Sequence, residues 1–324
     1  MNATTMAARS MSPKTAGWIE AGLFSLLIAV LGVAYAMAAA RGVNTAVFIL
    51  YSLLISAAML LAFTGFGENA RAIMFARESW IVGVGNIAVE GGYASLLGYV
   101  TPAEGSLMIR LSIPITILIG FVLYGRRPAW LVWMGAGMVG AVVVNLLFNV
   151  RPGIAGPVIG SAFACGLAVG IRAFASEFHK WNRAAVTIPD KIRVTALVTL
   201  VTAMTGLVTI GGLMVAVHLG LLSQTPLLPR PEALIHGPTI LLALFVGGAL
   251  FTGMTYLSFS CVLKIKSENF IATSAFMPVV TLLVQIPAAA IGLINLPPFD
   301  WRLVPAMLAA IIGVLMIIWG NRHV

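Results

Sequence analysis

Three polar side chains share one face of an otherwise apolar stretch of this chain. Asn86, Glu90 and Tyr93 are spaced i, i+4 and i+7, a spacing that projects side chains from the same side of a helix. Glu90 lies near the middle of the apolar stretch 79–101. An ionisable group at such a position is costly in a membrane unless it is paired or hydrated. The pattern therefore predicts that Glu90 binds a ligand or a proton; the alternative is a permanently protonated Glu90 that hydrogen-bonds to neighbouring helices.

A second ionisable residue, Arg110, lies near the start of the apolar stretch 106–124 and four residues before Pro114. Its guanidinium group can form an ion pair with Glu90, or it can bind the carboxylate of a ligand, for which its planar donor geometry is well suited. It can also extend to the membrane surface and leave only its aliphatic stem among apolar groups. The sequence leaves these three alternatives open.

Other polar residues within apolar stretches give weaker indications. Tyr256 and Gln285 lie in two further stretches, and we include them as candidates for substrate binding or coupling. For Gln285, hydrogen bonding between helices is an equal alternative. Tyr35 can either line a cavity or pack against other helices, and we favour packing. We expect Arg172, near the end of its stretch, to extend to the membrane surface.

Three prolines, Pro114, Pro278 and Pro287, lie inside apolar stretches. Each removes a backbone hydrogen bond and can kink its helix. We therefore expect these positions to bend helices during gating.

The elements that must position these residues are ten apolar stretches, each long enough to cross a bilayer. Hydrophobic residues make up 60% of the chain and charged residues only 9%. Because about 20 apolar residues span the hydrocarbon core as a helix, and because backbone groups in lipid must bond internally, the sequence predicts an all-α integral membrane protein with ten transmembrane helices. The expected spans are 17–40, 45–66, 79–101, 106–124, 129–150, 154–174, 194–220, 238–260, 269–293 and 302–320.

The distribution of basic residues predicts the orientation, because Lys and Arg are retained on the cytoplasmic side. Alternate connections from the N-terminus carry Arg9, Lys14, Arg71, Arg77, Arg126, Arg127, Lys180, Arg183, Lys191, Arg193, Lys264, Lys266 and Arg322. The opposite connections carry only Arg41, Arg151, Arg230 and Arg302. We therefore expect both termini to be cytoplasmic, with residues 1–16 as a polar N-terminal segment. The first span is too long for the core of a cleaved signal peptide.

Two segments in the two halves of the chain are similar. Residues 103–118 and 267–282 each have a Glu near the start and a Pro ten residues later. With five spans in each half, the second copy enters the membrane in the opposite direction, which is an architecture typical of secondary transporters. We therefore expect two inverted five-helix repeats, over 17–152 and 153–324.

This layout, together with residues 99–145, resembles the drug/metabolite transporter (DMT) superfamily of the EamA type. Residues 40–61 also resemble the start of the second helix in the amino-acid-exporting branches of that family. The resemblance implies a ten-helix metabolite exporter of the inner membrane, and direction of transport rests on the resemblance alone.

Several function classes lack their sequence motifs. No P-loop of the form G-x-x-x-x-G-K-[ST] occurs, which argues against an ATP-driven pump. Four His and two Cys without clustered spacing predict no metal site and no cofactor, and no basic stripe with interleaved aromatics indicates nucleic acid. We expect no enzymatic activity, although a membrane-embedded lipid-modifying enzyme or a channel is a third alternative.

The sequence as a whole predicts a secondary transporter that exports small polar metabolites, such as amino acids, by alternating access. The alternative is an importer of a nutrient, vitamin or osmolyte with the same fold. The expected partners are a small-molecule substrate and the lipid bilayer of the plasma (inner) membrane. Coupling to protons is left open.

Overall fold

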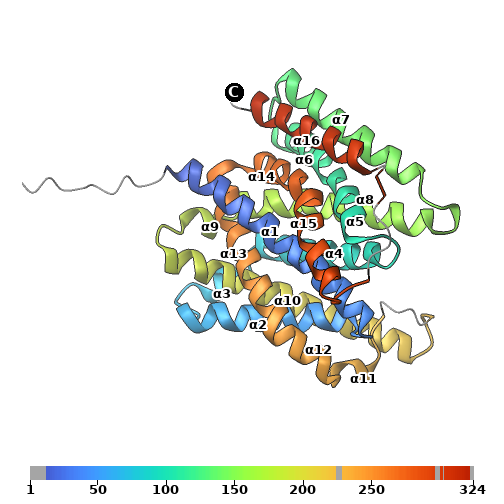
Figure 1. Cartoon of the computed structure of the whole chain (residues 1–324). Helices are drawn as coiled ribbons and strands as arrows, with labels where there is room; N and C mark the ends of the chain where they lie inside the picture. Colours follow the sequence, from blue (N-terminus) through green and yellow to red (C-terminus); the bar gives the residue numbers. More distant parts are fainter. Residues whose placement is uncertain (1–11, 224–227, 296–299, 302, 322–324) are drawn as a thin grey trace, which may run out of the picture.

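The chain folds into helices packed side by side (Figure 1). The computed structural model describes residues 12–223, 228–295, 300–301 and 303–321. Within them, the helices are α1 (Pro13–Ala40), α2 (Thr45–Thr64), α3 (Ala70–Met74), α4 (Arg77–Leu97), α5 (Pro102–Met108), η1 (Ile109–Leu111), α6 (Ser112–Tyr124), α7 (Trp130–Phe148), α8 (Pro152–Phe178), α9 (Lys180–Ala184), α10 (Ile188–His218), α11 (Pro231–Leu234), α12 (Gly237–Leu242), η2 (Ala243–Gly247), α13 (Gly248–Ile265), α14 (Ser267–Thr273), η3 (Ser274–Phe276), α15 (Met277–Ala290) and α16 (Leu303–Gly320). Arg9, Arg302, Arg322 and most of the predicted segment 1–16 lie outside the described residues.

Nine helical segments of the described chain are long and apolar enough to cross a membrane. The protein is therefore an all-α chain with the character of a multi-pass membrane protein. Each predicted span has a helical counterpart, but α4 is not among these nine. The polar Asn86 and Glu90 in its interior make it the least apolar of the ten.

Helix starts and ends follow local chemistry. Thr101 and Glu104 form a reciprocal capping box at the start of α5, and Thr187 and Asp190 form another at the start of α10. Such a box satisfies two backbone N–H groups that otherwise lack partners. Gly125 ends α6 with φ 62°, a left-handed conformation that favours glycine.

The prolines of the two similar segments lie beside interruptions of the α-helix. In the first segment, α5 and α6 are joined by the 3₁₀ turn η1, and Pro114 is the third residue of α6. In the second, α14 and α15 are joined by the 3₁₀ turn η3, and Pro278 is the second residue of α15. Pro287 lies inside α15 without interrupting it. The two segments therefore share an order of helix, 3₁₀ turn and helix.

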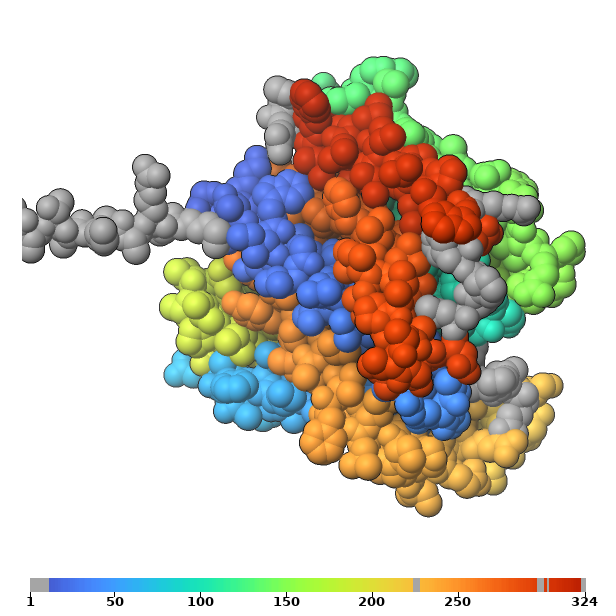
Figure 2. Space-filling model, viewed as in Figure 1, coloured from blue at the N-terminus to red at the C-terminus, as the bar shows by residue number. Residues whose placement is uncertain are grey.

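Helices from the two halves of the chain pack against one another. The helix α1 packs along α13 and α15, and α8 packs along α4 and α6. The pairs α2 with α10 and α7 with α16 also join the first half to the second. Figure 2 shows the N-terminal helix in blue against segments from the last third of the chain in orange.

The helices α7 and α16 lie side by side (Figure 1) and touch through their backbones at two glycines. A β-carbon on Gly135 would lie 2.2 Å from the carbonyl oxygen of Gly313, and one on Gly313 would lie 2.7 Å from that of Gly135. Small residues allow such close approach of membrane helices. A methyl group at either position therefore has no room.

Candidate functional site

Glu90 lies inside the helix bundle, with 6% of its surface exposed. The hydroxyl of Tyr35, on α1, donates a hydrogen bond to Oε2 of Glu90 on α4 at 2.5 Å. Tyr35 is fully buried, but its hydroxyl is bonded to the acid. Tyr35 therefore has a polar role as well as the packing role that the sequence favoured.

A second set of hydrogen bonds starts one turn before Glu90. Nη1 of Arg172, on α8, donates to Oδ1 of Asn86 at 2.7 Å, and Nδ2 of Asn86 donates to Oγ1 of Thr202, on α10, at 3.2 Å. Arg172 lines the same internal cavity as Glu90. The prediction that Arg172 extends to the membrane surface was wrong, because its helix turns this side chain toward α4.

Arg110 is buried, with 2% of its surface exposed. Nε donates to the carbonyl oxygen of Ser106 at 2.8 Å and Nη1 to that of Ser274 at 2.6 Å. Nη2 lies 3.8 Å from the sulfur of Met277. In the described part of the chain, no carboxylate lies within ion-pair distance of Arg110. Of the three alternatives, extension to the surface and direct pairing with Glu90 are both excluded in this conformation.

The turn η1 gives Arg110 its environment. Arg110 belongs to the 3₁₀ turn η1, and Ser274 belongs to the 3₁₀ turn η3. The hydrogen bond between Arg110 and Ser274 therefore joins the two turns. A buried guanidinium group whose partners are all uncharged keeps its full positive charge without compensation. Within the described residues, Arg110 bonds only to uncharged groups, two backbone carbonyl oxygens and a thioether sulfur.

Glu90, Arg110 and Arg172 line one small cavity of about 50 Å³. Glu90, Tyr93, Arg110 and Arg172 supply its main polar groups. The hydroxyl of Tyr93 is buried and has no hydrogen-bond partner among the described residues. The apolar wall includes Phe24, Val89, Val169, Met254, Phe270, Ile271 and Met277. The cavity has room for a few waters, so a metabolite requires the helices to move apart.

The sequence candidates are only partly brought together. Glu90, Tyr93 and Arg110 line the cavity, and Asn86 borders a narrow space beside Glu90 and Arg172. Tyr256 is half-buried, and neither it nor Gln285 is among the residues that line these two spaces. Gln285 is buried, and its Oε1 accepts no hydrogen bond from the part of the chain that the structure describes.

At one end of the bundle, ion pairs tie the halves together. Arg126, between α6 and α7, pairs with both Glu177 of α8 and Glu268 of α14. Its guanidinium carbon lies 5.0 Å from the centre of the Phe174 ring, a cation–π distance. Burial opposes the charge, but the hydrogen bond and charge of Glu268, with a further contribution from Glu177, raise the pKa of Arg126 above its ordinary value.

Lys264 of α13 pairs with Glu20 of α1 near the same end. At this end of the bundle, ion pairs therefore connect helices of the first half to helices of the second half. No grouping of three or more His, Cys, Asp or Glu that could hold a metal ion occurs among the residues described.

A separate polar cluster fixes the turn between α8 and α9. His179 is fully buried; its Nδ1 accepts a hydrogen bond from the backbone N–H of Asn182 at 3.3 Å. Its Nε2 lies 2.9 Å from Oγ of Ser79, whose hydroxyl donates to the carbonyl oxygen of Ile73 at 2.5 Å. These bonds fit a neutral ring protonated on Nε2. Burial lowers the pKa of His179 to about 4, against a smaller opposing effect of Glu78.

Comparison with known proteins supports the fold. No protein-family model matches the chain, and no curated protein matches it significantly. Chains of solved structures do match; one, a crystal structure described only as that of a protein, is 19% identical and superposes with a TM-score of 0.64. The match covers 95% of this chain and 98% of that one. At this identity the similarity shows that the two chains share a fold.

Proposed function

We propose that this protein is a secondary transporter that exports small metabolites with a carboxylate group, such as amino acids, by alternating access. It acts as a multi-pass protein of the plasma (inner) membrane, with both termini in the cytoplasm and no enzymatic activity. The observation that carries the proposal is the buried, uncompensated charge of Arg110 beside an internal cavity.

The architecture we propose is ten spans in two inverted five-helix repeats, with α4 as the tenth span. In such a protein, exchanging the halves maps each helix of one repeat onto its counterpart in the other. This exchange turns the packing of α1 with α13 into the packing of α8 with α4, and both pairs occur. It also maps the pair α2 with α10 and the pair α7 with α16 onto themselves, and both of these occur as well. The common order of helix, 3₁₀ turn and helix supports the same relation.

The chemistry of the cavity suits a zwitterion. Arg110 offers several N–H donors in the plane of its guanidinium group, which match the two oxygens of a carboxylate. Glu90, in the same cavity, has an oxygen for an ammonium group, and the unpartnered hydroxyl of Tyr93 adds a further polar contact. A zwitterionic substrate can therefore place its carboxylate at Arg110 and its ammonium group at Glu90, in a cavity that Arg172 also lines. This argument favours amino acids over uncharged metabolites.

Alternating access requires the cavity to open at each end in turn. The pairs of Arg126 with Glu177 and Glu268 fasten α8 and α14 at one end. Such contacts between the halves must break for the cavity to open there. The resemblance to the DMT superfamily supports export as the direction.

The test compares the metabolites of cells and medium with and without the protein. We expect amino acids to rise in the medium when the protein is present, and we expect Arg110→Gln to abolish the rise. The control is Arg71→Gln, which removes an exposed charge away from the cavity. A fall of the same compounds in the medium would show uptake instead, and unchanged levels of all amino acids would refute the proposed substrate class.

A further inference from the structure

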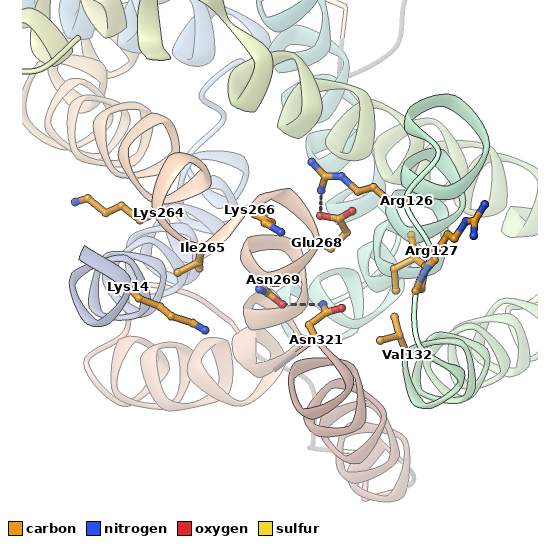
Figure 3. Close-up of a pocket in the computed structure, with 12 residues that line it drawn as sticks. Lys14, Arg126, Arg127, Val132, Lys264, Ile265, Lys266, Glu268, Asn269 and Asn321 are labelled. Atoms are coloured by element: carbon orange, nitrogen blue, oxygen red, sulfur yellow. Dashed lines mark hydrogen bonds and ion pairs between the residues drawn. The ribbon is translucent and has the colours of Figure 1, made fainter. Parts of the chain in front are cut away.

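A large pocket opens at the end of the bundle where Arg126 forms its ion pairs (Figure 3). Its volume is about 540 Å³, in the range of small-molecule sites. It is lined by the start of α1, the α6–α7 connection, the junction of α13 with α14 and the end of α16. We call it the basic vestibule, because Lys14, Arg126, Arg127, Lys264 and Lys266 line it against the single acid Glu268.

Two of the five cations are already neutralised. Arg126 is paired with Glu177 and Glu268, and Lys264 is paired with Glu20. No ion pair within the described chain involves Lys14, Arg127 or Lys266. In Figure 3, Lys266 lies between Lys14 and Arg127, and the guanidinium group of Arg127 is directed away from the other two. Three exposed cationic side chains thus line one pocket without an ion-pair partner among the described residues.

The backbone of Lys266 provides an independent observation. It has φ 66° and ψ 159°, and it is the only non-glycine residue with positive φ in the part of the chain that is described. This conformation is almost exclusive to glycine. It forms the junction between α13 and α14, where a glycine would fit without strain. A lysine here indicates that its side chain has a use that outweighs the strain.

Retention of positive charge on the cytoplasmic side explains why this end of the protein is basic. It does not explain a lysine at a position that favours glycine, because topology depends on the number of charges and not on their placement within a pocket. The amides of Asn269 and Asn321, hydrogen-bonded to each other at 2.9 Å, add uncharged donors to the lining.

We propose that the basic vestibule binds a phosphate-bearing anion, held by Lys14, Arg127 and Lys266. Three unpaired cations call for a ligand with more than one negative charge or with several strong acceptor oxygens, and a phosphate group supplies both. The phosphate belongs either to an anionic lipid headgroup, for which basic pockets at helix ends are suited, or to a free phosphorylated metabolite. This site is separate from the cavity around Glu90 and does not depend on what the protein transports.

The experiment uses the full-length protein purified in a neutral detergent at constant ionic strength. One arm titrates inorganic phosphate and glycerol 3-phosphate by calorimetry. The other arm measures retention of short-chain phosphatidylglycerol, against phosphatidylcholine, by native mass spectrometry. Lipid binding alone assigns the site to a headgroup, binding of the free phosphates alone assigns it to a metabolite, and either result supports the site.

The variants are Lys14→Ala, Arg127→Ala and Lys266→Gly, with Arg183→Ala as the control that removes an exposed positive charge from α9 outside the vestibule. We expect each vestibule variant to weaken binding about fivefold, and we expect the control to bind like the wild type. Lys266→Gly should also raise the melting temperature, and this measurement checks that the variant is folded. Equal weakening by Arg183→Ala, or no preference of the wild type for any phosphate probe, would overturn the proposal.

Discussion

Protonation of one side chain, His179 in the turn between α8 and α9, should lower the free energy of unfolding at acidic pH. Burial lowers the pKa of His179 to about 4 from an ordinary value of 6.5. A histidine whose folded-state pKa is depressed stabilises the fold fully above its unfolded pKa. That stability is lost as the pH falls from about 6.5 to about 4. The difference corresponds to about 3 kcal/mol, and it arises because burial disfavours the charged form of the ring. A second ring proton would also face the N–H of Asn182, which now donates to Nδ1.

The assay is thermal or denaturant unfolding of the detergent-solubilised protein between pH 7 and pH 4. Because carboxylates also titrate in this range, the wild type is compared with His179→Asn, whose amide oxygen can still cap α9. We expect the variant to be less stable at pH 7 and to approach the wild type near pH 4. Parallel pH profiles for the wild type and His179→Asn would refute the reasoning.

Three further predictions concern packing, backbone strain and the cavity. Gly135→Ala should destabilise the protein by about 1–3 kcal/mol, because its methyl group would meet the carbonyl of Gly313. Gly137→Ala, on the same helix but with open space around it, should be tolerated. Equal melting temperatures of the two variants would contradict this prediction. Lys266→Gly should stabilise the protein by about 1 kcal/mol in a denaturant titration, and a loss of stability would mean that the strain is absent. Glu90→Gln should leave the melting profile and membrane insertion intact and lower transport about tenfold or more in vesicles. Transport at the wild-type rate, with the wild-type pH dependence, would make Glu90 a structural residue.

Much of the helix content could be predicted from the sequence, because length and apolar character determine what can cross a bilayer. Each predicted stretch corresponds to a helix or to consecutive helical segments. The errors lie at the ends: α10 starts at Ile188, six residues before the predicted 194, since the capping box at Thr187 lets the helix extend beyond its apolar part. The short helices α3, α9 and α11 were not expected, because none is apolar enough to be found by this criterion.

The sequence could predict only those residues of the candidate site that lie on one helix, α4. The spacing of Asn86, Glu90 and Tyr93 was sufficient to place them on one side of α4, and all three border the internal spaces described above. Tyr35 and Arg172 come from other helices, and no local pattern connects them to Glu90. Their partners depend on the rotation of α1 and α8 about their axes, which the sequence does not show.

Depth in the membrane was a poor guide to the remaining candidates. Gln285 lies in the interior of α15, but it does not line the cavity that holds Arg110. Arg172 lies near the end of a predicted span, but its long side chain reaches Asn86. The position along a helix gives the depth of a side chain, and the helix face gives its neighbours. Only the packed structure specifies both.

The central claim is that Arg110 holds the carboxylate of a transported metabolite. It is tested most directly by counterflow in proteoliposomes, in which an unlabelled amino acid inside drives entry of the labelled one. We expect the wild type to exchange amino acids and to reject the matching amines that lack the carboxylate. We also expect Arg110→Lys, which keeps the charge but loses the planar donor geometry, to exchange them at least about tenfold more slowly. Equal exchange of amino acids and amines by the wild type, or wild-type rates in Arg110→Lys, would contradict the claim.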